Sequence, residues 1–136
     1  MLVTLGFGSW ISVNISIFTR LTFGPVCPQL DDTRAYTGSE SCLQLNVWSP
    51  PSPTARPVMV WIHGGGNAAG TATDPLYDGR RLAEAGGAVV VTVNYRLGQL
   101  GFLAHPSFDA ASGNYGTLDL VQALSWVQAN IAAFGG

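Results

Sequence analysis

Two short apolar runs constrain the fold more than any other feature of this sequence. Val58–Ile62 lies between a proline and three consecutive glycines, and Ala88–Asn94 is rich in β-branched residues. Uninterrupted apolar runs of this length are typical of strands buried on both faces, as in a parallel sheet. Between them, Asp78–Ala85 is predicted to form a short helix that two glycines end. A strand, a helix and a second strand predict an α/β fold with a parallel pair.

The clearest predicted helix is Thr117–Ile131. Its apolar residues repeat at intervals of four, three and four, which places them on one face: Leu120, Leu124, Val127 and Ile131. Asn114 or Thr117 can cap its start, and Gly135 ends it. A further short strand is predicted at Leu43–Trp48, ahead of a proline-rich loop.

The first nineteen residues carry no charge. A signal peptide needs a basic start and a continuous apolar stretch, whereas polar residues interrupt this segment, and no membrane span is expected either. Strict alternation from Ile11 to Ile17 predicts a half-buried strand. A degenerate signal or anchor, or a segment foreign to the fold, remain the alternatives.

Composition excludes several classes of partner. All six basic residues are arginines, and they are scattered except for Arg80–Arg81, so no nucleic-acid-binding surface is predicted. No cysteine or histidine recurs at ligand spacing, so neither a metal nor another cofactor is expected. Only 10% of residues are charged, against about 25% in an average soluble domain. We therefore expect much of the surface to lie against something larger.

The two cysteines are Cys27 and Cys42. A bridge between them would close a loop of about 15 residues, which stabilises a fold by about 3 kcal/mol in the chain-entropy model. Two free thiols fit the spacing equally well.

The segment with most chemical content is His63-Gly64-Gly65-Gly66, directly after a predicted strand. Glycines leave their backbone N–H groups unshielded, and two such groups aimed at one point form an oxyanion hole for acyl transfer. A plain turn or a phosphate-binding loop has similar glycines. However, no Gly-Lys-Ser/Thr follows, which excludes the P-loop.

Four blocks in register resemble the type-B carboxylesterases and cholinesterases. They are Ser39–Trp48, Pro57–Gly66, Val91–Leu103 and Gly113–Gly136. The resemblance covers residues 23–136 as the N-terminal part of such a domain, and leaves 1–22 as a divergent segment. It implies an α/β-hydrolase fold and a serine hydrolase that cleaves small-molecule carboxylic esters through an acyl-enzyme, with no cofactor.

The resemblance also implies roles for the glycine loop. Gly65 and Gly66 match the family's oxyanion donors, Gly64 gives the turn its freedom, and His63 shapes the loop rather than acting as the catalytic base. Trp61, a neighbour of this loop, is expected in the core.

Two further pairs are implied to be structural. Cys27 and Cys42 fall where the family has its first disulfide, which favours a secreted or periplasmic location. Arg96 and Asp119 fall where it has a buried ion pair, and removing one partner of such a pair leaves an unpaired charge.

No Gly-x-Ser-x-Gly nucleophile elbow occurs in the sequence. In the family this elbow follows a Phe-Gly-Gly like that at 134–136, so we expect a fragment that ends before the elbow strand, contains no member of the triad and is inactive alone. That missing strand would pair with Val58–Ile62, whose apolar edge is then open. A non-catalytic cholinesterase-like binding or adhesion module, and the product of a decayed gene, are the alternatives.

Overall fold

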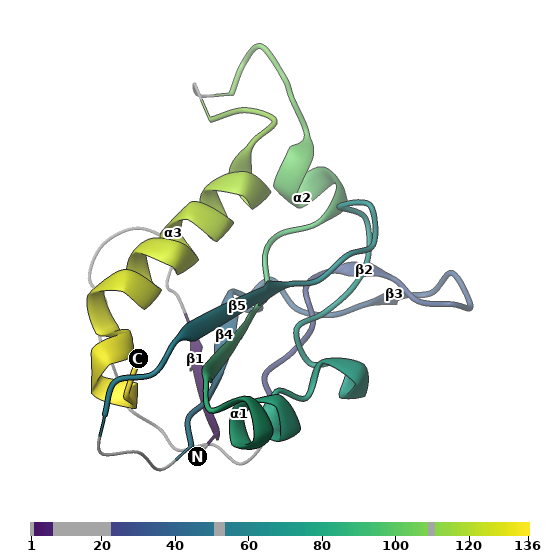
Figure 1. The fold of residues 1–136 in the computed structure, drawn as a ribbon. Coiled ribbons are helices and arrows are strands. Elements are labelled where there is room, and N and C mark those ends of the chain that lie inside the picture. The colour runs from purple at the N-terminus through teal and green to yellow at the C-terminus, as the bar shows by residue number, and fades with distance from the viewer. Residues whose placement is uncertain (1, 7–22, 51–53, 109–110) are drawn as a thin grey trace.

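The structure is a computed structural model that describes residues 2–6, 23–50, 54–108 and 111–136. Its centre is a mixed sheet of four strands (Figure 1). In spatial order the strands are β1 (Leu2–Gly6), β4 (Gln44–Trp48), β6 (Val89–Val93) and β5 (Val58–Ile62). β5 and β6 are parallel, while β4 is antiparallel to both β6 and β1. The predicted parallel pair and the α/β class are confirmed.

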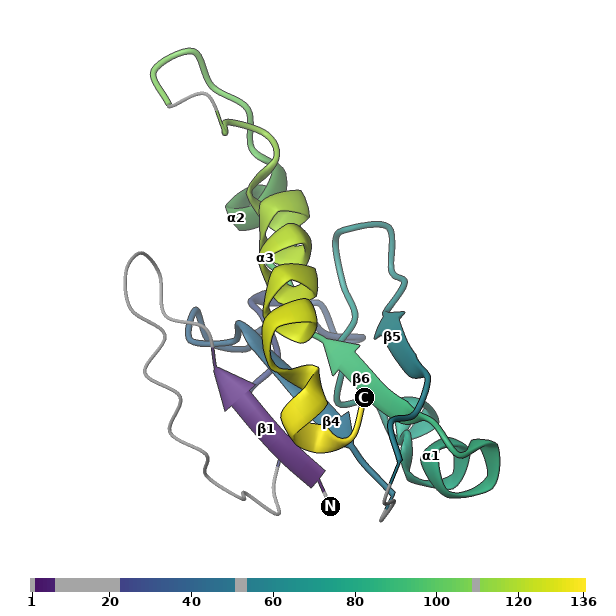
Figure 2. The ribbon, with the colours of Figure 1, turned by 60° about the vertical axis from the view of Figure 1, so that its left-hand side comes forward.

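Helices lie on both faces of this sheet (Figures 1 and 2). The long helix α3 (Tyr115–Asn130) crosses one face and α1 (Arg80–Gly86) lies against the other. The remaining elements are α2 (Gly98–Phe102), the 3₁₀ helices η1 (Pro75–Tyr77) and η2 (Ile131–Phe134), and a small hairpin of β2 (Gln29–Leu30) and β3 (Tyr36–Thr37). Helix α1 begins two residues later than predicted, with Gly79 at its N-cap position. Just ahead of the helix, the Asp78 carboxylate accepts a hydrogen bond from the Arg80 N–H at 2.9 Å.

The core follows the two-residue period of β6, which is buried at every position. Val89, Val91 and Val93 pack with the buried face of α3, where Trp126 and Val127 lie. Val90 faces the opposite way and packs with the α1 side of the sheet. The prediction of a strand buried on both faces therefore holds for β6.

For β5 the same prediction is wrong. Met59, Trp61 and Ile62 are 44%, 44% and 42% exposed, so Trp61 is not a core residue. Among the described residues β5 pairs only with β6, and a strand needs neighbours on both edges and both faces to be fully buried. An open apolar edge of this kind invites pairing with another strand.

The predicted helix face also needs one correction. Leu124 is 47% exposed, and the buried positions of α3 are Gly116, Ala123, Trp126 and Val127. The helix is oriented so that Trp126, rather than Leu124, packs into the core cluster with Val127.

The N-terminal part of the chain differs from the prediction. β1 was not predicted from the sequence, and the strand predicted at Ile11–Ile17 lies outside the described residues.

In the parts of the chain that the structure describes, no helix combines the length and the apolar character that a bilayer crossing requires.

Candidate active-site loop

The glycine loop leaves the sheet at the carboxyl end of β5. Gly65 has φ +117°, Gly66 has φ +62° and Asn67 has φ +61°, so the chain turns through the left-handed region at three successive residues. A Cβ on Gly65 would lie 1.9 Å from the Ala69 carbonyl oxygen, so only glycine fits there. Gly64 is different, because its φ is not positive and a Cβ on it would meet none of the described residues within 4 Å. The resemblance implied that Gly64 gives the turn its freedom; the positive φ and the close contact with Ala69 are found at Gly65.

The loop presents unused hydrogen-bond donors. The Gly65 carbonyl accepts from the N–H groups of Ala68 and Ala69 at 3.1 and 3.2 Å, which closes the turn. The N–H groups of Gly65 and Gly66 themselves donate to no other described residue, and both glycines are exposed. Two adjacent donors on a fixed turn can hold a negatively charged oxygen.

His63 directly precedes this turn in the chain, and its side chain is buried, with the residue only 3% exposed. Its Nδ1 lies 2.9 Å from the Gly64 carbonyl oxygen, and because a carbonyl only accepts, Nδ1 carries the proton. Its Nε2 is buried and has no partner among the described residues. Burial lowers the pKa of His63, and the contact with Gly64 opposes this effect in part. A neutral ring packed under the loop fits a shaping role.

Tyr95 contacts His63 and supports the same turn. Its ring stacks on His63 with centroids 4.7 Å apart, and its hydroxyl donates to the His63 carbonyl oxygen at 3.1 Å. The sequence contains a signal for this contact. His63 directly follows β5 and Tyr95 is the second residue after β6, and the carboxyl ends of neighbouring parallel strands meet at one edge of a sheet.

The far limb of the loop is held by Gln29. Its side-chain nitrogen donates to the Gly70 carbonyl oxygen at 2.9 Å, and its side-chain oxygen accepts from the Gly70 N–H at 2.8 Å. The same nitrogen donates to the Cys27 carbonyl oxygen at 3.0 Å. Sequence reasoning missed Gln29, and a pairing across 41 residues leaves no local signal.

Farther along, Asn94 holds the segment that leaves the loop. Its side-chain oxygen accepts from the Ala72 N–H at 2.7 Å, and its nitrogen donates to the Pro25 carbonyl oxygen at 3.2 Å. The loop is therefore fastened at several points by polar side chains.

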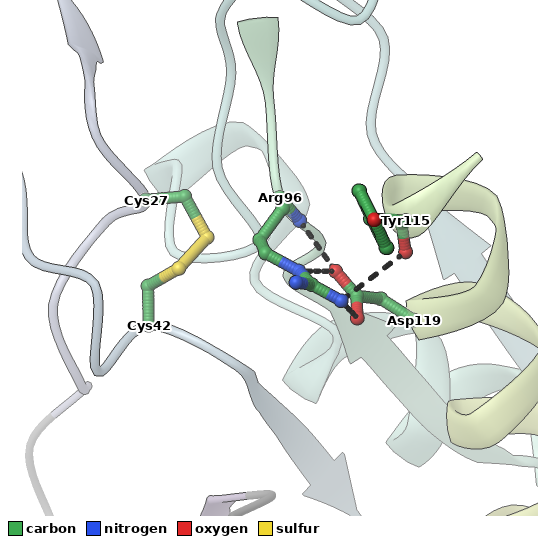
Figure 3. A network of polar contacts seen from close by, with 5 residues as sticks. All are labelled: Cys27, Cys42, Arg96, Tyr115 and Asp119. Carbon is green, nitrogen blue, oxygen red and sulfur yellow. Dashed lines mark hydrogen bonds and ion pairs between the residues drawn. A yellow bond between two sulfur atoms is a disulfide. The ribbon is translucent and has the colours of Figure 1, made fainter. Parts of the chain in front are cut away.

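The two implied structural pairs are shown in Figure 3. Cys27 and Cys42 form a disulfide. Arg96 donates to one Asp119 carboxylate oxygen through its backbone N–H and Nε, at 3.0 and 2.8 Å, and to the other through Nη2 at 2.7 Å. The hydrogen bonds to Asp119 raise the pKa of Arg96. Since the Asp119 side chain is 8% exposed and that of Arg96 36%, this pair is buried on one side only. It joins the chain after β6 to the first turns of α3.

No group of three or more histidine, cysteine or acidic side chains suited to a metal ion occurs within the described ranges.

Comparison with protein families gives a consistent result. The profile of the carboxylesterase family matches residues 16–136. The para-nitrobenzyl esterase of Bacillus subtilis (strain 168) is 51% identical over an alignment of 128 residues that covers 88% of this chain and 26% of that protein. The cholinesterase of Mus musculus is 57% identical over 99 residues, 72% of this chain and 16% of that protein. The fumonisin B1 esterase of Sphingopyxis macrogoltabida is 50% identical over an alignment of 113 residues that covers 78% of this chain and 21% of that protein.

Solved structures agree with these relatives. A thermophilic PNB esterase superposes with a TM-score of 0.76 at 49% identity, over 85% of this chain and 26% of that one. A second PNB esterase structure superposes equally well at 50% identity, over 85% of this chain and 25% of that one. The fold is thus part of an α/β hydrolase, and the chain spans about a quarter or less of the relatives it matches.

Proposed function

The chain belongs to the carboxylesterase family, and from this premise we propose that its glycine loop forms part of the oxyanion hole of a serine hydrolase. The substrates are small-molecule carboxylic esters. The observation that carries the proposal is the pair of exposed, unused N–H groups on Gly65 and Gly66 at the carboxyl end of β5.

In the proposed reaction a serine hydroxyl attacks the ester carbonyl and the carbonyl oxygen becomes negatively charged. The N–H groups of Gly65 and Gly66 donate to this oxygen more strongly than to the neutral carbonyl, which lowers the barrier. Losing one such donor typically costs about 3 kcal/mol of transition-state stabilisation. His63 shapes the loop from below and takes no proton from the nucleophile.

The nucleophile, the acid and the base of the triad come from residues outside these 136. The sequence contains no Gly-x-Ser-x-Gly elbow, and the chain covers between 16 and 26% of the three relatives named above. We therefore expect no ester hydrolysis from the 136 residues alone, and expect it only from a protein that also supplies the triad.

Hydrolysis of p-nitrophenyl butyrate tests the proposal. We expect no turnover above the buffer blank from the purified 136-residue chain, and saturable turnover from the longest open reading frame that contains it. Turnover by the short chain that survives purification would contradict the assignment of the triad. An inactive long protein with an intact elbow would contradict the esterase function itself.

The disulfide supports export to an oxidising compartment, because such bonds persist in secreted and periplasmic proteins and are rare in the cytosol. Alkylation of the protein with a maleimide before and after reduction measures the pairing in the cell. Thiols that react without reduction would argue against export.

A further inference from the structure

We propose that Gln29 is a positioning residue for the oxyanion loop and acts through Gly70. The inference rests on the function proposed above, since it concerns the placement of the Gly65 and Gly66 N–H groups. The structure joins Gln29 to the loop through a continuous series of contacts between residues far apart in the sequence.

The first contact is the pairing of the Gln29 amide with the Gly70 backbone. One bond of this pair uses the amide as a donor and the other uses it as an acceptor, at 2.9 and 2.8 Å. An aliphatic side chain can supply neither bond, and a carboxylate cannot supply the donor. The pairing therefore specifies a side-chain amide at this position.

The second contact joins Gly70 to the residues that precede the donors. A Cβ on Gly70 would lie 2.4 Å from both the Gly64 carbonyl oxygen and the His63 Nδ1. The Gly70 backbone therefore rests directly on the peptide that leads into Gly65. When Gly70 moves, this peptide loses the surface that it packs against.

Gln29 is also joined to the disulfide-bonded part of the chain. The Gln29 nitrogen also donates to the carbonyl oxygen of Cys27, a residue that is 1% exposed and disulfide-bonded to Cys42. Tyr95 holds the opposite limb through the His63 carbonyl. Side chains from different parts of the fold thus hold the two ends of the loop. Tyr95 holds the end at His63, and Gln29, which is hydrogen-bonded to the disulfide-linked Cys27, holds the end at Gly70.

Gln29→Glu tests the proposal in the longest reading frame that contains the chain. The substitution keeps the shape of the side chain but replaces the donor to Gly70 with a negatively charged oxygen. The matched control is Gln128→Glu, the same chemical change on the exposed side of α3. Gln29→Met, which is neutral and of similar length, serves if the charged variant does not fold.

Two readouts decide the outcome. With p-nitrophenyl butyrate we expect kcat of the Gln29 variants to fall between about tenfold and a hundredfold while KM changes less than about threefold, because small misplacements of catalytic groups cost rates of this order. Hydrogen–deuterium exchange should accelerate in the peptides that cover residues 63–70. The Gln128 control should match the wild type in both.

The proposal is overturned if both Gln29 variants keep kcat and loop exchange within twofold of the control, or if KM rises while kcat does not change. The exchange measurement needs no enzymatic activity. If the wild-type protein hydrolyses no ester, the proposed function fails, and faster exchange in the Gln29 variants still shows that the amide holds the loop.

Discussion

Replacing Gly65 with alanine should damage the proposed oxyanion hole far more than replacing its neighbour Gly64. At Gly65 the new methyl group would lie 1.9 Å from the Ala69 carbonyl oxygen, and φ of +117° is a conformation that L residues rarely adopt. At Gly64 the methyl group would meet no described residue within 4 Å, and φ is ordinary.

The size of the effect follows from this geometry. Cβ contacts shorter than 3.0 Å essentially never occur, so the Gly65 peptide or the Ala69 carbonyl must move by about 1 Å. Holding the unfavourable φ costs about 1–3 kcal/mol in addition. Displacing one oxyanion donor lowers kcat by about 10²–10³. We therefore expect this loss of kcat, with little change in KM, for Gly65→Ala.

The assay is the hydrolysis of p-nitrophenyl butyrate by the purified protein from the longest reading frame, with thermal unfolding of each variant as a control for folding. Gly64→Ala should keep kcat within about threefold of the wild type. The reasoning is refuted if Gly65→Ala keeps kcat within tenfold of the wild type, or if Gly64→Ala loses as much as Gly65→Ala does.

Three further predictions concern stability, all measurable by urea unfolding. Replacing both cysteines with serine should lower the free energy of unfolding by about 3 kcal/mol, since the bridge closes a 15-residue separation; an unchanged value would show that the bond does not form. Asp119→Ala should cost about 1–3 kcal/mol, less than a fully buried pair because the Arg96 side chain is 36% exposed. A loss below 0.5 kcal/mol, no larger than for an ordinary surface substitution, would contradict this. Burial lowers the pKa of His63, so below pH 6.5 the unfolded chain binds more protons than the folded one and stability should fall until the folded pKa is reached. His63→Gln should remove this part of the pH dependence, and an unchanged pH profile in this variant would contradict the reasoning.

The sequence alone determined the features that depend on local pattern. The apolar run of β6, the glycine loop after β5 and the position of α3 are all determined by residues that are neighbours along the chain. Backbone conformation and periodicity operate over this range, so inspection of the sequence identifies such elements. The resemblance to the carboxylesterase family also implied the disulfide between Cys27 and Cys42, which the structure contains.

The tertiary structure alone decided which apolar residues are buried and which side chains hold the loop. Trp61 is exposed because of the place of β5 in the sheet, and Leu124 because of the rotation of α3 against it. Gln29 reaches Gly70 across 41 residues, and the unfavourable φ falls on Gly65 rather than Gly64 through the path of the whole turn. Burial and long-range hydrogen bonds depend on how elements meet in space, and no local pattern of residues specifies that meeting.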